Sequence, residues 1–136
     1  MTIEPFGKLE YNKSTKEWVG LVDNICPNNK VELKIAVDNI DVVIAEKIEL
    51  LKQLTYDYKM IVEKLYDLAY KKYENTEFEA SREEIENMYF LSGLSLKKDN
   101  RTWWLVLEPH FNVTSIYNHI LRFTMLDRKL FGQTLK

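Results

Sequence analysis

The sequence predicts an α+β fold, and two observations lead to this prediction. Residues 40–73 contain no glycine or proline and carry apolar side chains at helical spacing, at Ile44, Ile48, Leu51, Tyr58, Val62, Leu65 and Ala69. The segments before and after this stretch read as short strands and turns. We therefore expect an N-terminal three-stranded antiparallel β-meander, two or three central helices and a C-terminal three- to four-stranded antiparallel sheet, in a single domain over residues 1–136.

The N-terminal strands are predicted from alternation and turn residues. Residues 6–11 and 18–22 flank a polar turn at 12–16, as in a β-hairpin. Gly20 lies within the second strand, where a missing side chain indicates a bulge or a close approach by a bulky neighbour such as Trp18 or a helix. Residues 31–37 give the clearest strand, because Val31, Leu33, Ile35 and Val37 share one side.

The central helical stretch is predicted to break once. As one helix its thirty-four residues would span about 50 Å, which is too long for a compact domain of this size. Asp38 or Asn39 can cap its start, and Thr55, Tyr56 and Asp57 offer the interior break. We therefore expect helices at about 40–54 and 56–74, although the unbroken periodicity would also allow one long helix. Ser81 and Glu84 form a capping-box pattern that predicts a third helix at about 82–90, ended by Gly93.

The C-terminal strands follow the third helix. Residues 94–96 and 102–107 should pair across a turn at 98–100, and Trp103 and Trp104 make the second strand bulky on both faces, as in a central strand covered on both sides. A loop is expected at 108–115, then a long strand at 116–125 with Tyr117, His119, Leu121, Phe123 and Met125 on one side. A last short strand is expected at 130–135.

Composition excludes several classes of function. The net charge of −2 offers no basic surface for nucleic acid. A single cysteine, Cys26, allows no internal disulfide and no two-thiolate metal site. The sequence has neither a secretory signal at its start nor an apolar window long enough to cross a membrane, so we expect a cytoplasmic location and no membrane partner.

The residue patterns predict no catalytic group, no metal site and no cofactor. His110 and His119 are the only histidines, and a metal would need further ligands brought together by folding. His119 is expected on the apolar side of its strand as a neutral, hydrogen-bonded core residue. A Cys26–His119 nucleophilic pair lacks any cysteine-hydrolase signature, and the isolated glycines form no phosphate-binding loop.

Two features suggest a surface for a protein partner. Tyr66, Tyr70 and Tyr73 follow helical spacing beside the main apolar face, and tyrosine brings rigid contact area with a polar tip. The same stripe would widen the core if it packed beneath Trp103 and Trp104. The acidic residues Glu77, Glu79, Glu83, Glu84 and Glu86 could face a basic ligand, or could serve only the helix dipole.

Four segments resemble a bacterial family that is catalogued only as a domain of unknown function. They are Phe6-Gly7-Lys8-Leu9, Trp18-Val19-Gly20, the Ser-x-Glu-Glu-Ile start at Ser81, and Tyr117-Asn118-His119-Ile120. The resemblance spans nearly the whole chain. It implies an uncharacterised bacterial cytosolic domain that stands alone, and it brings no activity with it.

Three hypotheses of function follow. The first is a non-catalytic protein-binding module, similar in type to immunity proteins that neutralise toxins, with Tyr66, Tyr70, Tyr73, Glu77, Glu79 and Glu83 as contacts. The second is a small-molecule-binding or enzymatic domain whose pocket lies between the helices and the Trp103–Trp104 sheet, near His119. The third is self-association through an exposed strand edge, which would give a homo-oligomer.

Overall fold

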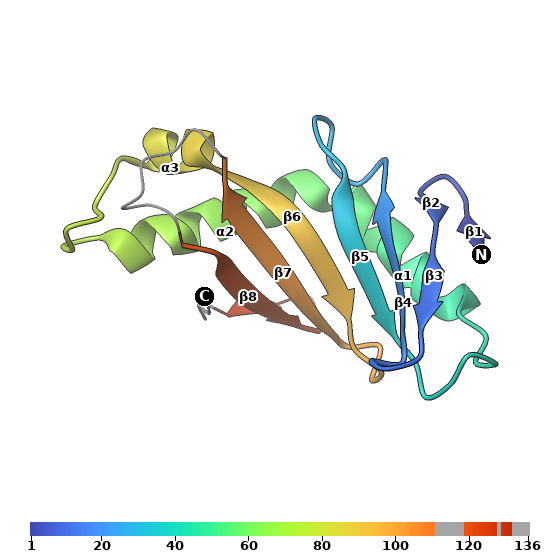
Figure 1. Cartoon of the computed structure of the whole chain (residues 1–136). Helices are drawn as coiled ribbons and strands as arrows, with labels where there is room; N and C mark the ends of the chain where they lie inside the picture. The colour runs from blue at the N-terminus through green and yellow to red at the C-terminus, as the bar shows by residue number, and fades with distance from the viewer. Residues whose placement is uncertain (111–118, 128, 132–136) are drawn as a thin grey trace.

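A computed structural model describes residues 1–110, 119–127 and 129–131 of this chain, with helices on one side of a sheet (Figure 1). Within these residues the larger sheet has seven strands in the order β3-β4-β5-β6-β7-β8-β9. A separate two-stranded ribbon pairs β1 (Thr2–Ile3) with β2 (Gly7–Lys8). The predicted α+β class is confirmed, while the strand counts differ in detail from those expected.

The N-terminal part of the large sheet is antiparallel. It contains β3 (Glu10–Asn12), β4 (Glu17–Val22) and β5 (Val31–Ala36). The predicted strand at 6–11 is divided, because residues 7–8 pair with β1 and only residues from Glu10 onward pair with β4. In β5 the predicted alternation is confirmed, since Val31, Leu33 and Ile35 are fully buried.

A parallel pair joins the two halves of the chain. Strand β5 lies parallel to β6 (Tyr89–Leu96), with Leu33 opposite Leu94 and Ile35 opposite Leu96. Parallel neighbours need a crossover connection, and here the crossover contains all three helices. This connection places the helices against one face of the sheet, where buried residues from helices and strands share one core.

The central helical stretch is two helices, as predicted. Helix α1 covers Ala45–Tyr56 and α2 covers Tyr58–Tyr73, separated by Asp57. The predicted start at residue 40 is wrong. The side-chain oxygen of Asn39 accepts a 2.8 Å hydrogen bond from the backbone N–H of Asp41, so Asn39 stabilises a turn and does not cap the helix.

The third helix confirms its capping box. Helix α3 covers Arg82–Met88; Ser81 Oγ accepts a hydrogen bond from the Glu84 N–H at 3.1 Å, and the Ser81 N–H donates to Glu84 Oε1 at 2.9 Å. Gly93 does not end this helix. Strand β6 already begins at Tyr89, and Gly93 lies inside it beside a β-bulge.

The C-terminal strands are antiparallel. They are β6, β7 (Thr102–Pro109), β8 (Leu121–Leu126) and β9 (Lys129–Phe131). Strand β7 is internal, as predicted, and Trp103 lies in the core. Trp104 lies on the opposite face between Lys97 and Arg122, whose charged groups are 3.2 and 3.5 Å from its ring centre. Most of the predicted 108–115 loop, residues 116–118 of the long strand and residues 132–135 of the last strand lie outside the described residues.

Candidate functional site

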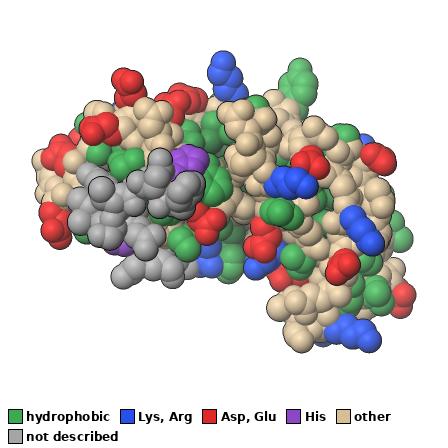
Figure 2. Space-filling model, turned by 45° about the horizontal axis from the view of Figure 1, so that its top comes forward, with side chains coloured by type: hydrophobic (Ala, Val, Ile, Leu, Met, Phe, Trp, Pro, Cys, Tyr) green, Lys and Arg blue, Asp and Glu red, His purple; other side chains and the backbone are tan. Residues whose placement is uncertain are grey.

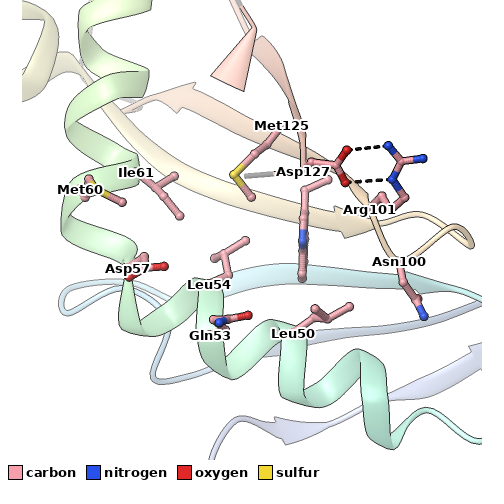
Figure 3. A pocket seen from close by; sticks show the side chains of 11 residues that line it. Leu50, Gln53, Leu54, Asp57, Met60, Ile61, Asn100, Arg101, Met125 and Asp127 are labelled. Atoms are coloured by element: carbon pink, nitrogen blue, oxygen red, sulfur yellow. Dashed lines mark hydrogen bonds and ion pairs between the residues drawn. The ribbon is translucent and has the colours of Figure 1, made fainter. Parts of the chain in front are cut away.

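A pocket of about 320 Å³ opens between the α1–α2 corner and the ends of β7 and β8 (Figure 3). The helices change direction at Asp57, and the first turn of α2 therefore stands apart from the last turns of α1. The inner face of the sheet supplies the opposite wall. The apolar residues that line the pocket are Leu50, Leu54, Met60, Ile61, Trp103 and Met125.

Polar side chains from three places also line this pocket. They are Gln53, Asp57, Asn100, Arg101 and Asp127. Arg101 and Asp127 form a two-point ion pair, in which Arg101 Nε donates to Asp127 Oδ1 at 2.9 Å. The hydrogen bond from Arg101 holds the pKa of Asp127 below its usual range. This pair is exposed, and it keeps the β7 and β8 ends together at the rim of the pocket.

A buried lysine supports the Asn100 side of the pocket. Lys47 in α1 is buried, and its ammonium group donates to the Asn100 side-chain oxygen. The Asn100 amide in turn donates to Glu46 at 3.2 Å. Burial lowers the pKa of Lys47 below its usual value. The Asn100 turn, which has a positive φ of 58°, is therefore fixed to the first turn of α1.

Two large, exposed side chains belong to the α1–α2 corner that borders the pocket. Tyr56, at the end of α1, is 91% exposed, and Met60, in the first turn of α2, is 53% exposed while also lining the pocket. Single exposed apolar residues are common on protein surfaces. Their position next to a pocket with an apolar wall makes this corner a candidate binding surface.

The predicted tyrosine stripe is largely buried, which corrects the expectation of a free surface. Tyr66 is 8% exposed and its hydroxyl donates to the Tyr89 carbonyl at 3.0 Å. Tyr73 is 3% exposed and its hydroxyl lies 2.6 Å from that of Tyr89. Tyr70 is half-buried against the core. Burial raises the pKa of Tyr66 to about 12, as expected for a phenol removed from water.

The predicted acidic residues are on the surface. Glu77, Glu79 and Glu83 are all exposed, as are Glu74, Glu84 and Glu86. Figure 2 shows acidic side chains gathered at the end of the molecule that carries α3. Residues 74–86, which we call the acidic segment, hold six glutamates and one arginine, a net charge of −5.

Arg82 fixes the acidic segment to α2. Its guanidinium contacts Asp67 at 2.7 Å, Glu86 at 2.9 Å and Glu63 at 3.2 Å. It also lies 5.3 Å from the centre of the Tyr66 ring. Together with the Ser81 capping box, these contacts hold the start of α3 in one orientation.

The histidines and the cysteine lie in separate places. The Nδ1 atom of His119 is 3.5 Å from the Tyr73 hydroxyl, His110 stacks on Phe90, and Cys26 is buried with its thiol 3.9 Å from the Leu91 carbonyl. Burial raises the pKa of the Cys26 thiol, which opposes thiolate formation. Among the described residues, no three His, Cys, Asp or Glu side chains are grouped so that they could hold a metal ion.

The hypothesis of a pocket near His119 is wrong about the position of the pocket. The pocket lies between the helices and the Trp103 strand, but His119 and Trp104 are not among its lining residues. His119 contacts Tyr73 and Phe78, near the opposite end of α2. Tyr66, Tyr73 and Tyr89 are buried at the end of the β6–β7 pair where Tyr89 faces Pro109, whereas Trp103 lies at the other end of this pair and lines the pocket.

Sequence reasoning placed a break within Thr55, Tyr56 and Asp57 and proposed a pocket between the helices and the sheet, but it put this pocket near His119 and not at the α1–α2 corner. Asn100 and Asp127 both have positive φ in tight turns at the pocket rim. Asparagine and aspartate often occupy such turn positions, so these residue types were the signal that the sequence offered. The approach of these two turns to α1 depends on how the helices pack on the sheet.

Comparisons with known proteins found no match: neither a family model, nor a curated protein, nor a solved structure is similar to this chain. Over the part of the chain that the structure describes, every helix is too short or too polar to traverse a lipid bilayer.

Proposed function

We propose that this chain is a non-catalytic protein-binding module of the bacterial cytosol that binds a basic protein through its acidic segment. An immunity protein that neutralises a toxin is the specific form we favour. The observation that carries this proposal is the net charge of −5 over residues 74–86, which are all exposed or partly exposed except for one buried anchor, Ile85. The proposal requires no reacting group.

The distribution of ion pairs supports a role in binding. Arg82 pairs with carboxylates of α2 and with Glu86. Glu79 accepts a 3.3 Å hydrogen bond from the Asn75 N–H, and the Glu84 carboxylate accepts one from the Ser81 N–H in the capping box. Within the described part of the chain, Glu74, Glu77 and Glu83 form no ion pair. These three carboxylates are therefore the ones that a basic partner can reach without breaking the fold.

The rigidity of the segment also supports this role. A surface that is held in its bound conformation loses less conformational entropy when a partner docks. The capping box and the Arg82 contacts provide this pre-organisation at the start of α3. Of the predicted tyrosine contacts, only half-buried Tyr70 offers surface to a partner.

Capture from extracts of the source cells tests the proposal. The bait is the full chain, compared with a variant in which Glu74, Glu77 and Glu83 are changed to glutamine. A matched control changes the exposed acids Glu10, Asp41 and Glu49 to their amides. We expect a basic protein that the wild type and the control both retain and that the first variant loses. Equal capture by all three proteins, or no captured protein, would overturn the proposal.

A further inference from the structure

We propose that the outer face of the large sheet carries a binding site for a small phosphate monoester, formed by Lys97 and Arg122 around Trp104. The helices cover the other face of this sheet, so the site faces away from them (Figure 1). It is also separate from the acidic segment, which follows α2. The site therefore adds a ligand to the proposed protein-binding role and does not depend on that role.

Strand pairing brings two cationic side chains to one aromatic ring. Trp104 is opposite Ser95 in β6 and opposite Thr124 in β8. Side chains two positions apart along a strand share a face, so Lys97, which follows Ser95, and Arg122, which precedes Thr124, reach the same ring. Their charged groups lie 3.2 and 3.5 Å from its centre.

The two cations are close to each other and have no carboxylate partner. Because both charged groups lie within 3.5 Å of the same ring centre, their separation is at most twice this distance, and like charges that close repel. Arg82 and Arg101 each pair with carboxylates. Lys97 and Arg122, in contrast, form no ion pair with any residue that the structure describes. A bound anion would offset their repulsion.

The neighbouring charges leave this part of the sheet positive. Burial lowers the pKa of Lys97, and the charges of Arg122 and Lys34 lower it further, while Glu17 opposes the shift. Lys34 itself lies 3.9 Å from Glu32. Three basic and two acidic side chains therefore meet here, a formal charge of +1. This local charge is opposite in sign to the net charge of −2 of the whole chain.

The indole and the guanidinium both offer donors to an anion. An aromatic ring has a negative face and a positive edge, so an anion approaches the edge while cations stack on the face. Trp104 is partly exposed, and its indole N–H donates to no residue in the described part of the chain. The Arg122 Nε atom is buried and also lacks an acceptor among the described residues.

A phosphate group fits this arrangement better than a carboxylate. Two cations favour a dianion over a monoanion, and a phosphate monoester is dianionic above its second pKa of about 6. Its oxygens match the fork of a guanidinium and leave an acceptor for the ammonium group. Val106 and Leu126 lie partly buried on the same face and offer apolar contact to the organic group.

The test is a titration of the full chain with phenyl phosphate at low salt and about pH 7.5, followed by NMR of the three tryptophan indole N–H signals. We expect the Trp104 signal to shift and those of Trp18 and Trp103, which are buried, to stay nearly unchanged. Benzenesulfonate carries the same ring and a single charge, so it should bind about three- to tenfold more weakly. Benzyl alcohol, which is neutral, should bind most weakly of the three.

Substitutions of the two cations sharpen the test. Lys97→Met and Arg122→Met each keep an apolar stem over Trp104 and remove one charge, so each should weaken the binding of phenyl phosphate by at least about fivefold. Arg122→Lys keeps the charge and should bind more tightly than Arg122→Met. Lys98→Met is the matched control, because Lys98 is exposed and pairs with Asp38, and it should bind phenyl phosphate as the wild type does.

The Trp18 and Trp103 signals also show whether each variant has kept its fold. If Lys97 and Arg122 served only to cover the ring, phenyl phosphate would leave the Trp104 signal in place. That result would overturn the proposal. So would benzenesulfonate binding as tight as that of phenyl phosphate, or equal affinities for phenyl phosphate of the wild type, Lys97→Met and Arg122→Met.

Discussion

Among the glycines in the described part of the chain, Gly20 has the least room for a side chain. A Cβ atom placed there would lie 2.3 Å from the Lys8 carbonyl oxygen and 2.8 Å from a methyl carbon of Leu9. The neighbours that come close to Gly20 are therefore Lys8 and Leu9, whereas the sequence suggested Trp18 or a helix. The absence of a side chain in β4 thus lets the N-terminal ribbon pack against the large sheet.

Gly20→Ala should therefore destabilise the protein by about 2–4 kcal/mol, since backbone atoms must move to remove the clash. Urea unfolding followed by circular dichroism measures this change. Gly93→Ala is the matched control, because its Cβ would meet Glu32 and Val106 at 3.6 Å and its φ is not left-handed. We expect it to change stability by less than about 1 kcal/mol, and equal losses in both variants would contradict the role assigned to Gly20.

The tyrosines of α2 show what sequence could and could not predict at this scale. Helical spacing correctly placed Val62, Leu65 and Ala69 in the core. It also placed Tyr66 and Tyr73 on an adjoining face, without a partner for their hydroxyl groups. Those partners are on Tyr89, in a strand that begins sixteen residues beyond Tyr73, and only the folded arrangement reveals them.

At the scale of elements, one guanidinium fastens α3 to α2. Arg82 contacts two carboxylates of α2 and one of its own helix, and its side chain is partly sheltered. Arg82→Met keeps an apolar stem over Tyr66 but removes these bonds. We expect a loss of about 1–2 kcal/mol in the free energy of unfolding.

Lys98→Met provides the comparison for this change. Lys98 pairs with Asp38 at 3.3 Å, but both side chains are well exposed. We expect its loss to cost less than about 0.5 kcal/mol in the same urea experiment. If the two variants were equally stable, the α2–α3 connection would depend on apolar packing alone.

Prediction of the elements was limited by contacts that are distant in sequence. The capping box of α3 and the alternation of β5 are local patterns, and both were confirmed. The parallel pairing of β5 with β6 depends on residues about sixty positions apart, so no local pattern encodes it. The pocket depends on the same arrangement, because α1 must cross the sheet near the β7 and β8 ends.

For the whole molecule, acid should be destabilising. The pKa values of three carboxyl groups are lowered, chiefly by hydrogen bonds that they accept. Glu84 accepts from the Ser81 backbone N–H and Asp99 from the Arg101 backbone N–H, while Asp127 accepts from the Arg101 side chain. Each group stabilises the fold above its unfolded pKa of about 4, and that contribution is lost as the pH falls through the lower, folded value. The urea concentration at the midpoint of unfolding should therefore decrease as the pH is lowered from about 6 to about 3.

A double variant checks the cause of this pH dependence. Glu84→Gln with Asp127→Asn removes two of the three groups, so its urea midpoint should fall less than that of the wild type over the same pH range. An identical fall in both proteins would assign the acid sensitivity to other carboxylates.

The net charge of −5 at one end of the molecule underlies the proposed function, and its most direct test is an affinity measurement. With the captured basic protein purified, calorimetry would compare the wild type with the Glu74, Glu77 and Glu83 glutamine variant at about 0.05 M and 0.3 M salt. We expect the variant to bind about tenfold more weakly at low salt and to show a smaller salt dependence. Equal affinities of the two proteins at both salt concentrations would contradict binding through the acidic segment.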